Sequence, residues 1–154
     1  MFRLRLEQWK RYLRKKVTPR ALKLALAELL TGLVRLNPVG NPSFWKPRRL
    51  KGGGTSPRLA RGYVGGHSRR NWQVSQAPLV AELPGADPKE GAANIAASEG
   101  YAKINALPQH TRRAFLVNPV PYIERLDRGW SKQAAAGWID AEFARVIAKL
   151  NVMK

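Results

Sequence analysis

The most constraining feature of this sequence is the segment 37–66, in which no helix or strand can run for long. It reads NPVGNPSFWKPRRLKGGGTSPRLARGYVGG, and its prolines and glycines favour turns and interrupt regular structure. A segment of this length without an element is unusual in a compact domain, so we predict a long functional loop. The loop divides one domain, residues 1–154, into an N-terminal helical region, 1–36, and a body, 67–154.

The region before the loop has the periodicity of helices. Thr18 followed by Pro19 is typical of a helix start, so a new helix or a kink is expected there. The preceding segment 3–16 is amphipathic with a dense basic face, which suits a membrane surface or, as we favour, packing on a neighbour. The later helix has one apolar face formed by four leucines: Leu22, Leu26, Leu29 and Leu33.

Two segments after the loop have the character of strands. Residues 67–76 alternate, with Trp72 and Val74 on one face and polar side chains on the other, which predicts a half-buried strand. A second candidate, RAFLVN, has two side chains on one face: Phe115 and Val117. Two strands make a marginal sheet. We therefore expect a further strand around Val80 or Trp138, or a sheet completed between subunits.

Three helices are predicted in the body. Residues 87–90, Asp-Pro-Lys-Glu, have the order of a capping box, so a helix should run from there to about Ala106. Its small residues would let another element approach closely, although Gly100 weakens its middle. A short helical turn at 122–127 should end at Gly129. A C-terminal helix is indicated by apolar residues at helical spacing: Ile139, Phe143, Val146, Ile147 and Leu150. The order helix, long loop, strand, helix, strand, helix predicts an α+β fold with a small antiparallel sheet.

Charge is distributed unevenly along the chain. Residues 1–70 carry 18 Lys and Arg and two acids, a net charge of +16, whereas residues 71–154 carry 10 basic and 8 acidic residues, a net charge of +2. The core of the loop, residues 46–61, has six basic residues and no acid, and in isolation it should be disordered. Such a basic half indicates a polyanion or an acidic protein surface as a partner, although a simple solvated surface is the alternative.

No arrangement suited to catalysis or to a metal is apparent. The chain has no cysteine, which excludes disulfides and thiolate ligands, and His67 and His110 lie outside any ligand or triad spacing. The glycine runs at 52–54 and 62–66 lack the Lys-Ser/Thr of a phosphate-binding loop. Charged residues in the turn 124–128 are expected to pair with one another. We predict a protein that is not an enzyme and has no cofactor or metal.

No apolar run approaches the length of about 18 residues that spans a membrane. The basic N-terminus also lacks the uninterrupted apolar stretch and cleavage site of a secretory signal. The expected location is a cytoplasm, or a particle assembled there.

Three motif segments occur in order: NPVGNPSFW, then GYVGGHSRRNWQV, then NPVPYIERLDRGWSKQAAAG. Together they resemble the head–tail joining proteins of long-tailed bacteriophages, a group of neck, tail-completion and minor tail proteins. The resemblance spans about residues 20–150. The matching positions are Pro38, Val39, Gly40, Asn41, Pro42, Arg69, Asn71, Trp72, Asn118, Pro121, Tyr122, Leu126, Gly129, Trp130, Ser131, Lys132, Gln133, Ala134 and Gly137.

The match also has departures. Family members bridge Trp45 to Gly62 with fewer residues, so the basic insert is the part that the resemblance explains least. Four positions differ from the family pattern: Asn37 stands for threonine, Ile123 for alanine, Asp127 for glutamate and Ala135 for proline.

The resemblance implies a small α+β subunit that assembles into a ring around the channel by which DNA leaves the head. Segment 118–122 would be a rigid turn, because its prolines fix backbone angles, and it would aim the short helix with Leu126. Trp130 would face a neighbouring subunit or lie in the core, whereas Trp72 is expected in the core. The expected interface residues are Asn118, Pro121, Tyr122, Leu126, Gly129, Trp130, Lys132, Gln133 and Gly137.

The basic residues would then contact one of two partners. One is genomic double-stranded DNA in the channel, bound without sequence specificity and in a salt-sensitive way. The other is an acidic surface of a portal, adaptor, stopper or tail-terminator protein. The candidate contact residues are Arg48, Arg49, Lys51, Arg58, Arg61, Arg69 and Arg70.

The expected location is the virion neck or tail, and the host cytoplasm during assembly. The rival hypothesis from another class is a free basic nucleic-acid-binding protein. Only the stretch RRNWQV approaches the interleaving of aromatic and basic residues that base stacking requires.

Overall fold

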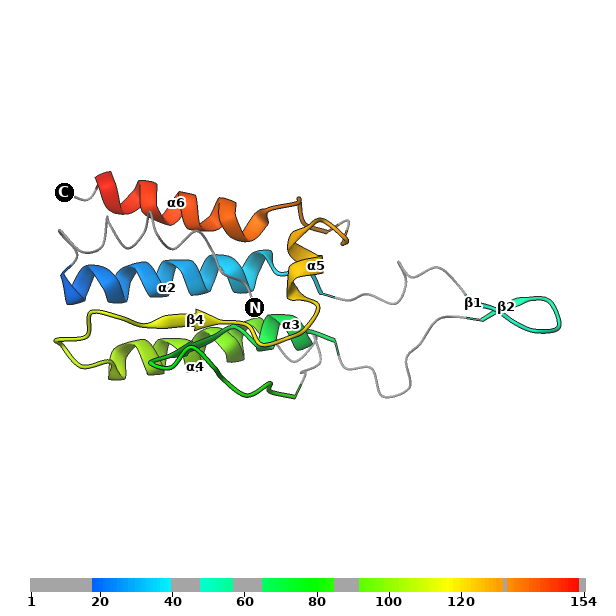
Figure 1. Ribbon diagram of the computed structural model, residues 1–154, viewed down its shortest axis with the longest axis horizontal. Coiled ribbons are helices and arrows are strands. Elements are labelled where there is room, and N and C mark those ends of the chain that lie inside the picture. The colour runs from blue at the N-terminus through cyan, green and yellow to red at the C-terminus, as the bar shows by residue number, and fades with distance from the viewer. Residues whose placement is uncertain (1–17, 40–47, 57–64, 85–91, 132, 153–154) are drawn as a thin grey trace.

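The computed structural model describes residues 18–39, 48–56, 65–84, 92–131 and 133–152. Within these residues, three longer helices form the body: α2 (Pro19–Leu36), α4 (Ala92–Ala106) and α6 (Trp138–Val152). α2 lies between α4 and α6 and packs on both (Figure 1). The short elements of the body are α3 (His67–Arg70), β3 (Gln73–Ser75), β4 (Phe115–Val117) and α5 (Ile123–Asp127). The mixture of helices with a small antiparallel sheet confirms the predicted α+β class.

α2 begins where the sequence predicts. The Thr18 hydroxyl accepts a hydrogen bond from the backbone N–H of Ala21 at 3.2 Å, and Pro19 occupies the first turn. All four predicted leucines are buried, and Leu30 and Val34 are buried as well. The buried surface is wider than one face because α2 is covered from two sides. The predicted helix at 3–16 lies outside the described residues.

α4 approaches α2 closely at a glycine, as its small residues predict. A Cβ at Gly100 would overlap Leu30 Cδ2, and Leu30 is fully buried. The helix cost of a glycine in this position is therefore offset by the close packing it permits. The predicted capping box at 87–90 lies outside the described residues.

α6 places the predicted apolar face on α2, but it also buries an acid. Ile139 and Val146 are buried, while Phe143 and Leu150 pack against the core from partly exposed positions. Glu142 is buried beside Gly32, where a Cβ would overlap its carboxylate. Arg145 donates to both oxygens of this carboxylate, at 2.9 and 2.6 Å, so the buried charge is paired.

β3 and β4 form the antiparallel pair that the sequence predicts, with Val74 opposite Leu116. Leu116 packs against the core beside Val74. The prediction of a strand over 67–76 is wrong for its first part, because His67–Arg70 form the helical turn α3. The prediction of a half-buried strand is also wrong, because Asn71 and Gln73 are buried along with Val74.

These buried amides hold the neighbouring segment in place. Asn71 accepts from the backbone N–H of Leu83 at 2.8 Å and donates to its carbonyl at 2.9 Å, and Gln73 donates to the carbonyl of Ala81 at 2.8 Å. Residues 81–83 therefore dock on β3 through side chains. No third strand joins this sheet in the described part of the chain. The strand expected around Val80 or Trp138 was a wrong prediction, since Trp138 begins a helix.

The long loop contains a short hairpin that the sequence analysis missed. β1 (Arg48–Arg49) pairs with β2 (Thr55–Ser56) in an antiparallel register. The turn is closed by Leu50 N–H to Gly54 O, 3.1 Å, and Gly53 and Gly54 take φ angles of 87° and 88°, which favour glycine. The hairpin lies apart from the helices, at the right of Figure 1. Residues 40–47 and 57–64 on either side lie outside the described residues.

Candidate functional site

The three motif segments that carry the family resemblance meet at one corner of the body. We call this cluster the motif corner and define it by Asn37, Ser68, Trp72, Asn118, Asp127, Gln133 and Trp138. At its centre is Asn37, which is 0% exposed at the C-terminal cap of α2. Its Oδ1 accepts from Ser68 Oγ at 3.1 Å and from Trp72 Nε1 at 2.9 Å. Its backbone carbonyl accepts from Arg69 Nη2 at 2.8 Å. One residue thus ties the end of α2 to α3 and to Trp72.

Two further amides bring the third segment to the same place. Asn118 donates to the carbonyl of Ser68 at 2.8 Å and accepts from Val120 N–H at 3.2 Å, which shapes the proline-containing turn. Gln133 bonds the backbone of Val39 in both directions, at 3.3 and 2.7 Å. Positions far apart in the sequence are therefore held side by side by partly buried bonds of Asn118 and by exposed bonds of Gln133.

Asp127 joins α5 to α6. Its carboxylate accepts from the backbone N–H of Ile139 at 2.9 Å, and its carbonyl accepts from Gly137 N–H at 2.6 Å. Burial raises the pKa of Asp127 above its ordinary value, while the bond from Ile139 opposes that rise. The predicted pairing within the turn 124–128 holds for Glu124 and Arg128, 3.7 Å apart. Asp127 instead acts as a helix cap.

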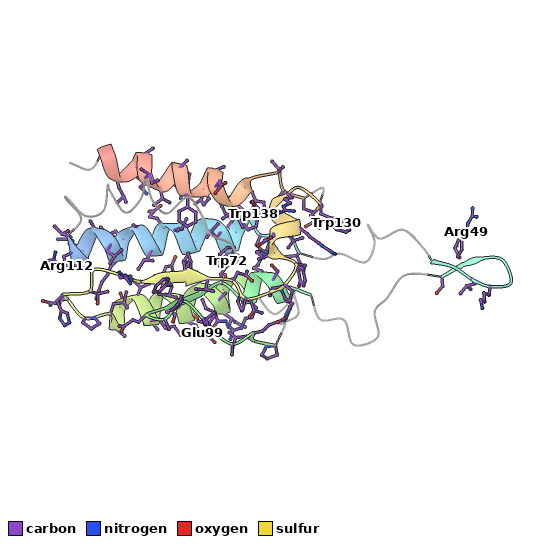
Figure 2. All side chains as sticks on the ribbon, in the orientation of Figure 1. Arg49, Trp72, Glu99, Arg112, Trp130 and Trp138 are labelled. Atoms are coloured by element: carbon purple, nitrogen blue, oxygen red, sulfur yellow. The ribbon has the colours of Figure 1, made fainter. Side chains whose placement is uncertain are left out.

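The tryptophans divide into a buried pair and one exposed ring. Trp72 and Trp138 are buried and meet edge to face, with ring centroids 6.1 Å apart and an interplanar angle of 85°. Trp72 is thus in the core, as predicted. Trp130 is 71% exposed and lies under the Arg125 guanidinium, which is 4.9 Å from the ring centroid. The core alternative for Trp130 is wrong for the single chain. Figure 2 shows Trp130 beside α5 at the surface.

The other expected interface residues have mixed positions. Pro121 and Tyr122 are exposed on the turn before α5, and Leu126 packs partly against the core. Gly129 ends α5 with a φ of 80°, as predicted, and Gly137 precedes α6 with a φ of 75°. Lys132 lies outside the described residues.

The basic residues grouped by sequence, where the structure describes their side chains, lie in two separate places. Arg49 and Lys51 are exposed on the hairpin, and Figure 2 shows Arg49 far from the body. Arg70 instead makes a two-point bond to Glu99, at 2.8 and 2.7 Å, and Arg69 is partly buried against Asn37. Desolvation lowers the pKa of Arg69. Arg58, Arg61 and the side chain of Arg48 lie outside the described residues.

A groove of ≈ 520 Å³ opens beside the motif corner. Its walls come from the end of α2, from residues 133–136 and from the first turns of α6. Arg35, Arg69 and Arg145 line it together with the buried Glu142, and three consecutive alanines line it beside Trp138. It is a cationic groove with a partly apolar wall.

The described residues hold no constellation with an obvious reaction chemistry. Within them no group of three or more His, Cys, Asp or Glu is placed to hold a metal ion. His67 contacts Glu82 through Nε2 and lies 6.4 Å, centroid to centroid, from the Tyr122 ring. No helix in the described ranges is long and apolar enough to cross a membrane. The corner and the groove together present charged, amide and aromatic groups.

Sequence reasoning missed the most connected residue of the site. Asn37 was noted only as a departure from the family pattern, and Glu142 was not noticed at all. The signal for Asn37 was its position between the last helical leucine and Pro38, because helices usually end at or before the residue that precedes a proline. For Glu142 the signal was an acid three residues before Arg145 on the apolar side of α6. Comparison with protein families, curated proteins and solved structures finds no match for this chain.

Proposed function

We propose that this protein is a structural component of the neck or tail of a long-tailed bacteriophage, without enzymatic activity. In this role it joins the DNA-filled head to the tail as a homo-oligomeric ring around the DNA exit channel. Its neighbours are portal, adaptor, stopper or tail-terminator proteins and tail proteins. The proposal places it in the virion, and in the host cytoplasm during assembly.

The observation that carries the proposal is the convergence of the three motif segments. Residues of all three take part in one set of contacts: Asn37 with Trp72, Asn118 with Ser68, and Gln133 with Val39. Chance similarities would be expected at unrelated positions in the fold. Segments that belong to one family motif would be expected to lie together, as these do. Trp130 stands exposed next to this corner, and exposed tryptophans are enriched among interface anchors.

The test is a phage carrying a deletion of this gene, with the purified chain analysed in parallel. We expect the deletion to leave filled heads and complete tails that are not joined, counted by electron microscopy. Light scattering should show the purified chain to be larger than a monomer, alone or with neck proteins added. Infectious particles formed without the protein would refute the proposal.

A second candidate function, a free nucleic-acid-binding protein without sequence specificity, is favoured by one observation. Arg49 and Lys51 are exposed on the hairpin, where phosphates could reach them. Titration of a DNA duplex at rising salt separates the two. Tight binding by the monomer at physiological salt would favour the free binder, whereas binding that appears only after assembly would favour the neck protein.

A further inference from the structure

We propose that the groove beside the motif corner binds an acidic peptide segment of a different protein by receiving a carboxylate. This inference goes beyond the neck assignment, because it follows from the chemistry of the groove alone. Three features carry it: an excess of guanidinium groups, two buried donors without an acceptor, and an apolar wall.

The side chains that line the groove carry more positive than negative charge. Arg145 is paired with Glu142 through two bonds and also lies 3.5 Å from Glu28. Arg35 makes no ion pair with a described residue, and Arg69 donates only to the neutral carbonyl of Asn37. Two guanidinium groups therefore face the groove without a carboxylate. Arg69 is also partly buried, where an unpaired charge is unfavourable.

Two N–H groups of the lining residues also lack an acceptor. Arg69 Nε and Trp138 Nε1 are both buried and have no hydrogen-bond partner in the part of the chain that the structure describes. Buried donors are nearly always satisfied, so two of them on residues that line one groove require an explanation. A carboxylate offers about four acceptor positions and matches the guanidinium fork. A carboxylate in the groove would pair with the guanidinium groups that face it.

The apolar wall favours a peptide over a nucleic acid. Residues 134–136 and Ala141 line the groove with methyl groups, which suit the backbone and small side chains of an extended segment and not a run of phosphates. The segment should come from another protein. This chain carries 10 acidic against 28 basic residues, and four of its described glutamates are already paired with Lys or Arg within the chain.

The test uses the full chain and follows its tryptophan indole N–H signals by ¹⁵N–¹H NMR. The chain has five tryptophans, and Trp138→Phe assigns the signal of interest. The probe is a capped hexapeptide of alternating Asp and Ala, and the matched control peptide has Asn in place of Asp. We expect the Trp138 signal to shift saturably with the acidic peptide, with at least about tenfold weaker binding of the neutral peptide. The Trp130 signal should stay in place.

Variants of the arginines test whether the acidic peptide binds in the groove. Arg35→Gln combined with Arg69→Gln should weaken binding of the acidic peptide by about tenfold or more. Arg35→Gln alone, at an exposed position, tests the same point if the double variant folds poorly. Arg112→Gln is the matched control, because Arg112 is exposed at the far end of the body from Trp138 in Figure 2; it should leave binding unchanged.

Four outcomes would overturn the proposal. The first is an unmoved Trp138 signal at millimolar peptide, and the second is equal binding of the neutral peptide. The third is a shift that depends only on protein concentration, which would identify a second copy as the occupant. The fourth is displacement of the peptide by a DNA duplex with the same shift, which would identify phosphate. None of these results bears on whether heads and tails are joined, so the two proposals fail separately.

Discussion

The motif corner and the β1–β2 hairpin of the basic loop are held together in opposite ways. In the corner, residues up to 94 positions apart are joined by hydrogen bonds, and Asn37 at its centre is 0% exposed. In the hairpin, the described ladder consists of two residue pairs. The glycines of its turn, Gly52–Gly54, would meet nothing within 4 Å if each carried a Cβ.

This difference shows how each region can serve the protein. A change in the corner alters many contacts at once, so it should affect folding. A hairpin this small is marginally stable by itself. Few packing contacts constrain its sequence, and its exposed charges are available for electrostatic contact with a partner. The two regions should therefore respond differently to mutation.

The largest effect is expected for Asn37→Ala. The substitution removes the acceptor of Trp72 Nε1 and Ser68 Oγ in a site closed to water, and unmet buried donors are costly. We expect the free energy of unfolding to fall by about 3 kcal/mol, measured by urea denaturation. The hairpin control, Lys51→Ala, should change it by less than about 0.5 kcal/mol. Similar losses in the two variants would erase the contrast between the regions.

Asp127→Ala should have the next largest effect. The loss of the cap on α6 should cost about 1–2 kcal/mol, whereas Asp127→Asn keeps an oxygen that can accept from Ile139 N–H. Because burial raises the pKa of Asp127 from 3.8, the folded state binds the proton more tightly than the unfolded state does. Stability from this group is therefore lost as the pH rises from about 3.8 through the raised pKa, then stays level.

The Asn variant makes this pH dependence measurable. Relative to the native chain, Asp127→Asn should gain stability over that same pH interval and keep the gain at neutral pH, as followed by thermal denaturation at several pH values. Below the interval both chains carry a neutral side chain and should converge. A relative loss for the Asn variant as the pH rises would mean that the carboxylate is stabilised in the folded state.

Gly100→Ala tests the close approach of α4 to α2. Alanine favours a helix by about 1 kcal/mol over glycine, but a Cβ here would overlap Leu30, which is fully buried and cannot move into solvent. Overpacking typically costs about 1–3 kcal/mol, so we expect a net loss of about 1 kcal/mol in chemical denaturation. Gly52→Ala in the open hairpin turn is the matched control and should be nearly neutral. A more stable Gly100→Ala protein would show that the two helices can separate without cost.

Much of the helical part of the fold could be predicted from the sequence. The leucine face of α2, its Thr18-Pro19 start and the end of α5 at Gly129 are local signals, and each one is present in the structure. They are predictable because the residues that decide them lie within a few positions of one another.

The parts that could not be predicted depend on partners distant in sequence. Asn71 and Gln73 were expected to face water because they are polar, yet their amides supply bonds to the backbone of residues 81–83 and are buried. The sequence analysis groups Arg69 and Arg70 with the loop, because a sequence shows the charge of a side chain but not where that side chain lies in the fold. The hairpin was missed because its strands are too short to show alternation.

The smallest effect on folding, and the sharpest test of the comparison, is expected for Trp130→Ala. The ring is 71% exposed and its described aromatic or cationic contact is with Arg125, so stability should change by no more than about 0.5–1 kcal/mol. Leu79, which is 72% exposed elsewhere on the surface, supplies the matched control. If Trp130 anchors a neighbouring subunit, Trp130→Ala should abolish complementation of the gene deletion while the purified chain unfolds at nearly the native temperature, and Leu79→Ala should complement fully. Complementation by both variants would remove Trp130 from the interface, since contact between subunits that persists without this side chain must lie on another surface.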